Sequence, residues 1–357
     1  QMSSSTDFAL SLLRAASPHS ENFVISPFSL GAALAIVHDG AKDDTQEQLT
    51  RLLGQNLSPA EVSSLYSSLT TALSEKNSKV VTNVANRFFL AKGFNLKPDY
   101  ASHVEKAFSA GVEHINFKDA QGSANHVNSF VSEHTRGMIP RIVSAPDFVS
   151  AIAVLINAVY FKGEWATQFK KEATQTKSFH GISGDRNAQF MRASNLSTRF
   201  SQSADLTVVS LAYKDPTYSF VVLMPSGDFG EWRASLTGDK LQLALGSLHM
   251  GKINLELPKF KIESETDGNT ALRMLGVTRI FEGSANLSGI SDGGLVVSKI
   301  VHKAVLEVSE EGTEAAAATA VIMTRCRPAP PLKLVFDRPF LYAVVKGNDI
   351  LFVGQHA

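Results

Sequence analysis

The sequence predicts an α+β fold, in which strands are not regularly interleaved with helices. Helical periodicity is clear in the first part of the chain, whereas strand-like runs dominate after about residue 150 of the 357. The chain ends in two apolar runs around a short polar turn, which predicts a β-hairpin. No Pro/Gly/Ser-rich linker or charged block interrupts the chain before a C-terminal loop, so we expect a single domain over residues 1–357.

The predicted elements follow in chain order. Apolar residues at helical spacing predict a helix within residues 1–16 and two more over 29–37 and 124–134. Strands are predicted over 151–161, 206–211, 218–224 and 253–257, and a long strand over 295–308. The closing hairpin pairs 341–345 with 350–353 across the turn at 346–349.

The alanine-rich segment 310–320 (EEGTEAAAATA) can be interpreted as a strand without a fixed partner. Four alanines favour a helix, but the segment leads into a proline-rich stretch at 328–331 that no helix can contain. In an extended conformation, one face carries only threonine, alanine and other uncharged side chains, so that face can be buried in a sheet. An alanine-rich linker or surface helix has the same composition, so composition alone leaves both interpretations open.

Motifs along nearly the whole chain resemble those of the serpin family, in family order. They lie at residues 22–30 (NFVISPFSL), 40–45, 135–139, 157–165, 258–264, 275–277, 286–290, 336–340 and 350–354. The resemblance implies three β-sheets with about nine helices. It also implies an exposed reactive-centre loop over about 310–331, between the long strand and the C-terminal hairpin. The chain looks most like the intracellular, ovalbumin-type inhibitory members.

This resemblance implies a suicide-substrate inhibitor of serine proteases. A protease cleaves the loop and forms an acyl-enzyme; the freed hinge then inserts into the central sheet and carries the tethered protease away before deacylation. The residues that match the hinge are Glu310, Gly312, Thr313, Glu314, Ala315, Ala316, Ala317, Ala318 and Thr319. Gly312 and the run from Ala315 to Ala318 are small and uncharged, which favours an inhibitor over a non-inhibitory chaperone or carrier, the alternative class.

The cleaved bond is expected between Arg325 and Cys326, because arginine followed by a small residue suits a trypsin-like protease. Counting from Gly312 by the usual family spacing instead places the bond between Cys326 and Arg327. Cleavage after Arg327 is disfavoured because Pro328 follows it. Papain-like cysteine proteases are the alternative target class.

Four polar residues in apolar surroundings, Ser26, Ser29, Asn157 and His302, match the serpin cluster beneath the central sheet, here called the shutter. Each also has a plain structural interpretation, since the serines can be helix caps and a histidine on an apolar strand face is most often a satisfied core residue. Trp165 matches the tryptophan at the top of that sheet, here called the breach, and is otherwise a large core aromatic.

Composition excludes several other functions. Lys+Arg and Asp+Glu both number 34, so net charge favours neither nucleic acid nor an anionic membrane as partner, and no apolar run is long enough to span a bilayer. Residues 289–293 satisfy G-x-S-x-G around Ser291, but the strand–turn–helix context of a nucleophile elbow is missing. With no metal-spaced histidines, one cysteine and no phosphate loop, we expect no metal, no cofactor and no catalytic site.

The sequence leaves the cellular localisation of the protein open. A single cysteine, Cys326, allows no intramolecular disulfide and favours the cytoplasm. Residues 1–16 contain no signal-peptide core, so secretion would require that a signal had been removed. Sequons at Asn56, Asn195 and Asn286 carry little weight, because about two arise by chance. We expect a soluble monomer whose partner is a trypsin-like serine protease.

Overall fold

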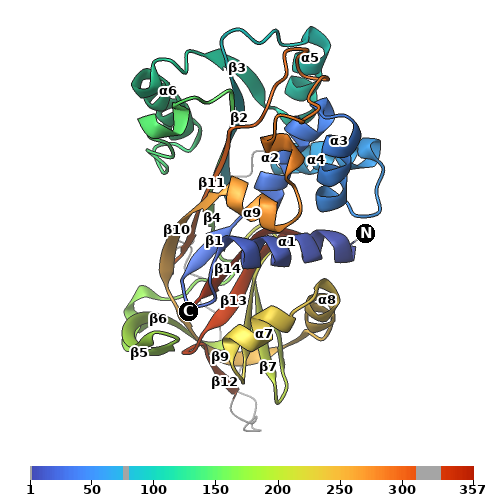
Figure 1. The fold of residues 1–357 in the computed structure, drawn as a ribbon. Coiled ribbons are helices and arrows are strands. Elements are labelled where there is room, and N and C mark those ends of the chain that lie inside the picture. The colour runs from blue at the N-terminus through green and yellow to red at the C-terminus, as the bar shows by residue number, and fades with distance from the viewer. Residues whose placement is uncertain (1, 75–79, 311–330) are drawn as a thin grey trace, which may run out of the picture.

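The computed structural model describes residues 2–74, 80–310 and 331–357, and within these residues nine α-helices surround two β-sheets. The helices are α1 (Met2–Ala16), α2 (Pro27–Gly40), α3 (Asp43–Leu53), α4 (Pro59–Ser74), α5 (Pro98–Phe108), α6 (Ala120–His134), α7 (Phe229–Ser235), α8 (Gly238–Gly246) and α9 (Gly268–Met274). Helices α3 to α6 lie at one end of the molecule and strands β5, β6, β9 and β12 at the other, with β4 and β11 running between them (Figure 1).

The five-stranded sheet has a parallel pair at its centre. Its order is β10 (Phe260–Asp267), β11 (Lys299–Val308), β4 (Ala153–Gly163), β2 (Val80–Ala91) and β3 (Gly111–Ile115). β11 and β4 run parallel, whereas each pairs antiparallel with its outer neighbour, β10 or β2. Val127 and Val131 of α6 pack on one face, and α2 lies against the other. Because both faces are covered, nearly every residue of β4 and β11 is buried.

The larger sheet has nine strands among the described residues. It runs β1 (Phe23–Ile25), β14 (Asp349–His356), β13 (Phe340–Lys346), β8 (Tyr218–Pro225), β7 (Leu206–Ala212), β6 (Gly184–Gln202), β9 (His249–Pro258) and β12 (Leu332–Val335), with β5 (Gln175–Gly181) also on β6. The 19-residue strand β6 joins two parts of this sheet, one made of β5, β9 and β12 and the other of β7, β8, β13, β14 and β1. Its register against β9 shifts between Ala193 and Leu196. The three predicted sheets are therefore present, with two of them continuous through β6.

Helix α2 forms the centre of the fold. Ser26 caps it by accepting a hydrogen bond from the Ser29 amide, and Pro27 occupies its first turn. Every residue of the helix except Asp39 is buried. A Cβ on Gly31 would come within 2.4 Å of the Tyr66 ring, so glycine permits the close approach of α4.

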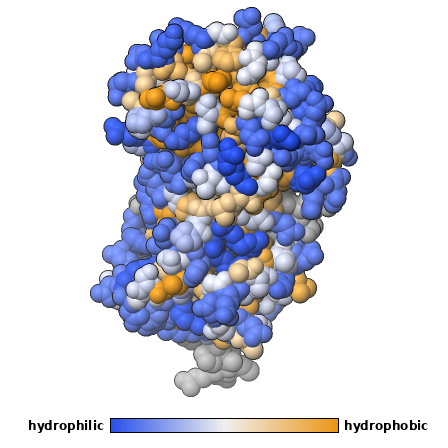
Figure 2. All heavy atoms as spheres, in the orientation of Figure 1, coloured by the Kyte–Doolittle hydropathy of each residue, from blue (hydrophilic) through white to orange (hydrophobic). Residues whose placement is uncertain are grey.

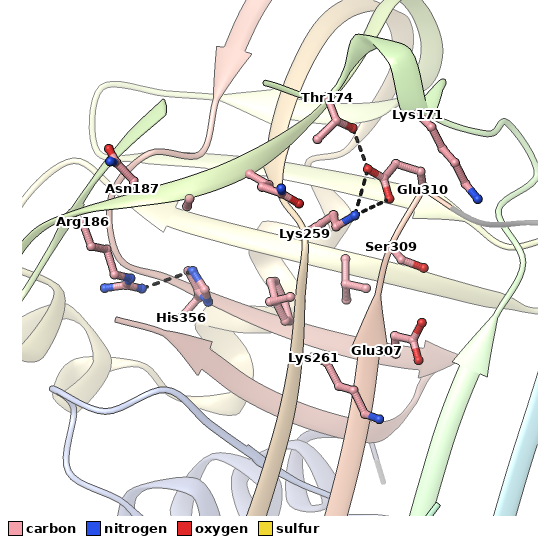
Figure 3. A pocket seen from close by; sticks show the side chains of 14 residues that line it. Lys171, Thr174, Arg186, Asn187, Lys259, Lys261, Glu307, Ser309, Glu310 and His356 are labelled. Carbon is pink, nitrogen blue, oxygen red and sulfur yellow. Dashed lines mark hydrogen bonds and ion pairs between the residues drawn. The ribbon is translucent and has the colours of Figure 1, made fainter. Parts of the chain in front are cut away.

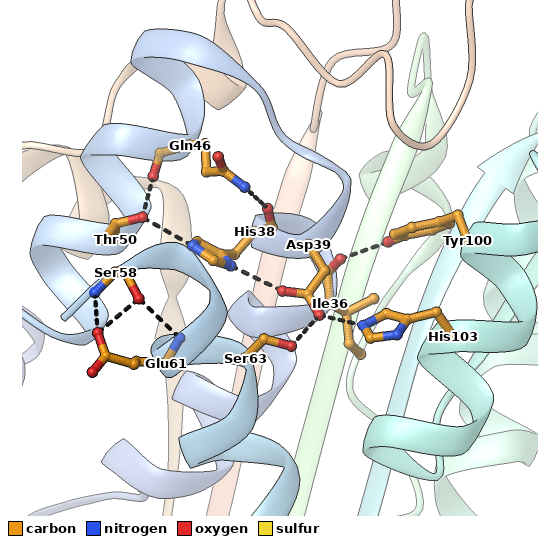
Figure 4. Close-up of polar contacts among 10 residues, drawn as sticks. All are labelled: Ile36, His38, Asp39, Gln46, Thr50, Ser58, Glu61, Ser63, Tyr100 and His103. Atoms are coloured by element: carbon orange, nitrogen blue, oxygen red, sulfur yellow. Dashed lines mark hydrogen bonds and ion pairs between the residues drawn. The ribbon is translucent and has the colours of Figure 1, made fainter.

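The Asp39 carboxylate and the adjacent His38 join the C-terminal end of α2 to three other helices (Figure 4). Asp39 accepts hydrogen bonds from His38 Nδ1 at 3.0 Å, Ser63 Oγ of α4 at 2.7 Å and His103 Nε2 of α5 at 2.6 Å. His38 Nε2 lies 2.9 Å from Thr50 Oγ1 of α3. Burial raises the pKa of Asp39, but these hydrogen bonds outweigh burial and hold that pKa below its ordinary value. The network therefore ties α2, α3, α4 and α5 together.

The mixed fold predicted from the sequence is confirmed, and most predicted elements form within a few residues of their expected ends. The long strand begins later than predicted, at Lys299 and not at residue 295, because the amides of Val297 and Ser298 donate to Ile280 and Ala153 in other segments. Ser291 is buried and lies in an irregular segment with no helix directly after it, so the nucleophile-elbow interpretation fails.

Hydrophilic side chains cover most of the face shown in Figure 2. A few large apolar side chains, among them Val149, Leu243 and Met274, are exposed. Within the described ranges, no helix is both long enough and apolar enough to cross a bilayer.

Candidate functional site

The expected loop connects two well-placed strands. β11 ends at Val308, and Ser309 and Glu310 continue it to the edge of the described residues. The described residues resume at Pro331, and β12 begins at Leu332. The hinge residues from Gly312 to Thr319 and the residues Arg325, Cys326 and Arg327 lie outside the described residues, so the site is built here from the groups around both ends of the loop.

The four expected shutter residues lie together beneath the central parallel pair. His302 of β11 lies directly opposite Asn157 of β4, and its Nδ1 is 2.6 Å from Asn157 Oδ1. The amide Nδ2 of Asn157 donates to Ser29 Oγ at 2.8 Å. The Ser26 amide donates to His302 Nε2 at 3.1 Å, and Ser26 Oγ donates to Leu351 O at 2.6 Å. The cluster thus connects β11, β4, α2 and β14.

Hydrogen-bond roles fix the proton on His302. Because Nε2 accepts from the Ser26 amide, Nδ1 carries the hydrogen and donates to Asn157. The side chain is completely buried, and burial lowers the pKa of His302 to about 3. The imidazole is therefore neutral at physiological pH, with both nitrogens satisfied.

Two residues that the sequence did not single out extend this polar row. Thr266 of β10 lies opposite His302, and Asn86 of β2 lies opposite Asn157. Thr266 Oγ1 and Asn86 Oδ1 are buried and have no hydrogen-bond partner in the described part of the chain. The row Thr266, His302, Asn157, Asn86 therefore crosses four strands at one register, and only its two central members are fully paired.

Trp165, the expected breach residue, lies where β11 ends. Its indole N–H donates to Ser309 O at 2.7 Å. The ring is stacked on Tyr213 at a centroid distance of 4.6 Å and is only 2% exposed. The indole thus holds the backbone of the chain just before the loop begins.

Glu310, the first hinge residue, is held at the same place. Its carboxylate accepts hydrogen bonds from Thr174 Oγ1 at 2.6 Å and from Lys259 Nζ at 3.2 Å, and the residue is only 5% exposed. Burial raises the pKa of Glu310, but these hydrogen bonds and the Lys259 charge hold it below its ordinary value. Sequence reasoning missed Thr174 and Lys259 as partners, although Lys259 stands within one of the quoted family motifs.

A cavity of about 910 Å³ adjoins this contact. Figure 3 shows Lys259, Thr174 and Glu310 together on one side and Arg186 beside His356 on the other. Arg186 Nη2 lies 3.2 Å from His356 Nε2, so the imidazole nitrogen accepts and His356 is neutral. Burial and the nearby Arg186 charge lower the pKa of His356 to about 3.

Among the described residues, no group of three or more His, Cys, Asp or Glu side chains is arranged to hold a metal ion. The geometry is instead that of a buried polar contact between two parallel strands and a second polar contact at the start of a loop.

A family model described as serpin (serine protease inhibitor) matches residues 3–357. The chain belongs to the serpin family. Iripin-2 from Ixodes ricinus is 35% identical to this serpin over 360 residues, covering 98% of this chain and 91% of the relative. Human leukocyte elastase inhibitor is 34% identical over 373 residues, covering 99% of this chain and 98% of the relative.

Solved serpin structures have the same fold. Uncleaved ovalbumin superposes with a TM-score of 0.88 at 26% identity, covering 99% of this serpin and 98% of ovalbumin. Serpin-12 of Manduca sexta gives a TM-score of 0.88 at 27% identity, covering 99% and 97%. Family membership and the inhibitors among the relatives support protease inhibition as the general function of this serpin.

Proposed function

We propose that this serpin is a suicide-substrate inhibitor of trypsin-like serine proteases. The observation that carries the proposal is the parallel pairing of β11 with β4 at the centre of the sheet, directly before the loop. A segment that turns back from the end of β11 runs antiparallel to β11, and therefore also antiparallel to β4. One parallel boundary is then replaced by two antiparallel ones, which are slightly more stable per residue.

The inserted strand supplies the free energy for trapping. About ten inserted residues, each adding hydrogen bonds worth about 0.5 to 1.5 kcal/mol, contribute on the order of 10 kcal/mol. Both faces of the sheet are buried at this position, so the inserting residues must be small or apolar. The hinge from Gly312 to Thr319 has this composition apart from Glu314. The uncleaved protein is then a kinetically trapped state that reaches its stable form after cleavage.

The proposed roles of the shutter and the breach both follow from insertion of the hinge between β11 and β4. Insertion must separate His302 from Asn157, so this hydrogen bond opposes spontaneous opening of the sheet. Trp165 and Lys259 hold Ser309 and Glu310, the point at which the hinge would first turn into the sheet. Both contacts therefore keep the loop out until cleavage releases the strain.

The protease class rests on the loop sequence. Arginine at 325 followed by Cys326 fits the deep acidic primary pocket of a trypsin-like enzyme, and the neighbouring bond between Cys326 and Arg327 is the alternative. The hinge at 310–319 lies on the N-terminal side of the bond between 325 and 326. Cleavage at this bond therefore leaves the roughly ten residues that insert attached to β11.

Incubation with trypsin at near-equimolar ratio tests the proposal. The expected result is a covalent adduct that survives boiling in detergent, with release of a C-terminal peptide that begins at Cys326. A peptide that begins at Arg327 moves the reactive bond by one residue. Complete cleavage without adduct contradicts inhibition of trypsin; a rise in melting temperature after such cleavage then identifies a loop that inserts without trapping.

A further inference from the structure

Basic residues are concentrated on the part of the fold that adjoins the C-terminal end of the loop. Strands β5, β6, β9 and β12 carry six Lys or Arg residues and two acidic ones, whereas the whole chain carries 34 of each sign. The six are Lys177, Arg186, Arg192, Arg199, Lys252 and Lys333, and the two acids are Asp185 and Glu256. A net charge of zero for the chain therefore conceals a local excess of positive charge.

Three of these cations converge on one buried carboxylate. Glu256 of β9 is 2% exposed and contacts Lys177 of β5, Arg192 Nε at 3.4 Å and Lys333 Nζ at 3.2 Å. The three side chains come from three different strands, and their exposed fractions are 34%, 38% and 58%. One carboxylate cannot neutralise three cations, so the group keeps two positive charges at the surface.

Glu256 also orients the cations. Arg192 uses Nε for this contact, which leaves both Nη groups for another acceptor. Because the carboxylate already restrains all three side chains, a partner would lose less side-chain entropy on binding them than on binding free lysines. The arrangement is a preorganised patch for acidic groups, here called the basic triad.

The triad lies within reach of a protease bound at the loop. Lys333 follows Cys326 by seven residues, so even a fully extended chain separates them by at most about 25 Å. A protease domain of about 230 residues has a radius of gyration of about 17 Å and is roughly 45 Å across. A protease that holds residues 325–326 in its active site therefore brings its own surface close to β12 and β9.

We propose that Lys177, Arg192 and Lys333 form an exosite that binds an acidic surface segment of the target protease. This inference rests on the proposed function and adds a second recognition element to it. The exosite acts on encounter with the protease, so it raises the association rate and does not alter the partition between trapping and release. A sulfated polysaccharide would recognise the same cations; the position beside the loop favours the protease.

The test compares two trypsins of the same primary specificity and opposite net charge. For the wild-type serpin, the second-order rate constant of inhibition should be higher with the anionic trypsin and should fall as NaCl rises from about 50 to 300 mM. The triple variant K177Q/R192Q/K333Q should lose about tenfold in this rate constant with the anionic trypsin only, and its salt dependence should flatten. The stoichiometry of inhibition should not change.

The matched control is K92Q/K118Q/R141Q, which removes three exposed positive charges outside β5, β6, β9 and β12. Since both triple variants lose the same net charge, a local exosite predicts an effect for the triad alone. The single variant K333E leaves Lys177 and Arg192 on Glu256, and it should slow inhibition of the anionic trypsin even where the triple variant is too unstable to assay.

Equal rate constants for the wild type, K333E and the triad variant would overturn the exosite while leaving inhibition intact. Absence of a covalent adduct with either trypsin would instead contradict the proposed function itself. Heparin binding that depends on the triad, combined with unchanged inhibition rates, would identify the patch as a polysaccharide site and would also overturn the proposal.

Discussion

The imidazole Nδ1 of His302 and the amide Oδ1 of Asn157 lie 2.6 Å apart, directly opposite each other on the two central parallel strands. Each also bonds to the start of helix α2, His302 through the Ser26 amide and Asn157 through Ser29 Oγ. The pair therefore fastens β11 to β4 and fastens both strands to the most buried helix. In the proposed mechanism the two strands separate, so the strength of this pair would control how readily the sheet opens.

Replacement of His302 with alanine should destabilise the protein by about 1 to 3 kcal/mol, because it leaves the buried Asn157 carbonyl and Ser26 amide without partners. The weakened boundary between β11 and β4 should also promote loop–sheet polymers during mild heating. Urea unfolding measures the first effect and size-exclusion chromatography after heating measures the second. A variant that stays monomeric under conditions that leave the wild type monomeric would contradict the proposed role of the shutter.

Stability should decrease as the solution becomes more acidic than about pH 6.5. His302 and His356 have pKa values of about 3 in the folded protein, against about 6.5 for an unfolded histidine. Between these values the unfolded state binds more protons, so the stabilising contribution is complete above pH 6.5 and is lost as the pH falls toward 3. Each histidine contributes a slope of at most about 1.4 kcal/mol per pH unit.

The variant His356→Gln isolates one of these contributions. Its amide oxygen can still accept from Arg186, but the side chain does not titrate. Urea midpoints between pH 4 and 7 should vary less with pH than those of the wild type. Replacement of the exposed His249 with glutamine is the control and should leave the pH profile unchanged; an equal effect of both variants would argue against buried neutral His356.

Replacement of Glu310 with glutamine should loosen the start of the loop. The variant keeps an acceptor for Thr174 but loses the charge attraction to Lys259, worth on the order of 1 kcal/mol because Lys259 is 38% exposed. We expect a lower urea midpoint and faster polymerisation. K261Q removes an exposed cation two residues along from Lys259 and serves as the control. Indistinguishable midpoints for E310Q and the wild type would mean that the ion pair does not hold this segment.

Replacement of Thr313 with arginine should convert the inhibitor into a substrate. Insertion would place an unpaired guanidinium in a sheet whose two faces are buried, which opposes the strand formation needed for trapping. The stoichiometry of inhibition should rise at least about tenfold, since about 1.4 kcal/mol already changes a partition by that factor. Thr313→Val keeps the size and should still form adduct; efficient adduct formation by the arginine variant would exclude insertion as the mechanism.

Sequence reasoning was most successful where local pattern and structure coincide. The alternation around His302 correctly predicted its strand face, because a buried strand repeats every two residues. The sequence pattern could not identify the partners of Glu310, since Thr174 and Lys259 are 136 and 51 residues away along the chain. The Asp39 network was missed for the same reason: His103 and Ser63 reach Asp39 only after four helices have packed.

The same limit applies to charge. The chain contains equal numbers of basic and acidic residues, which argues against a polyanion as partner for the chain as a whole. This balance says nothing about the charge of one region of the surface. Lys177, Arg192 and Lys333 are far apart in sequence, and only the pairing of β5, β6, β9 and β12 brings them to Glu256. The register shift of β6 between Ala193 and Leu196 could not be foreseen either, because register depends on the partner strand.

Because the indole of Trp165 is hydrogen-bonded to the carbonyl of Ser309, intrinsic tryptophan fluorescence can report on the start of the loop. The chain contains two tryptophans, and one of them, Trp165, is hydrogen-bonded to the base of the loop. In the proposed mechanism, insertion of the hinge would draw the Ser309 carbonyl away from the indole and would disturb the stacking on Tyr213. Emission intensity and wavelength followed by stopped flow would then record strand insertion in real time without an attached dye, and replacement of Trp232 with phenylalanine would assign the change to Trp165.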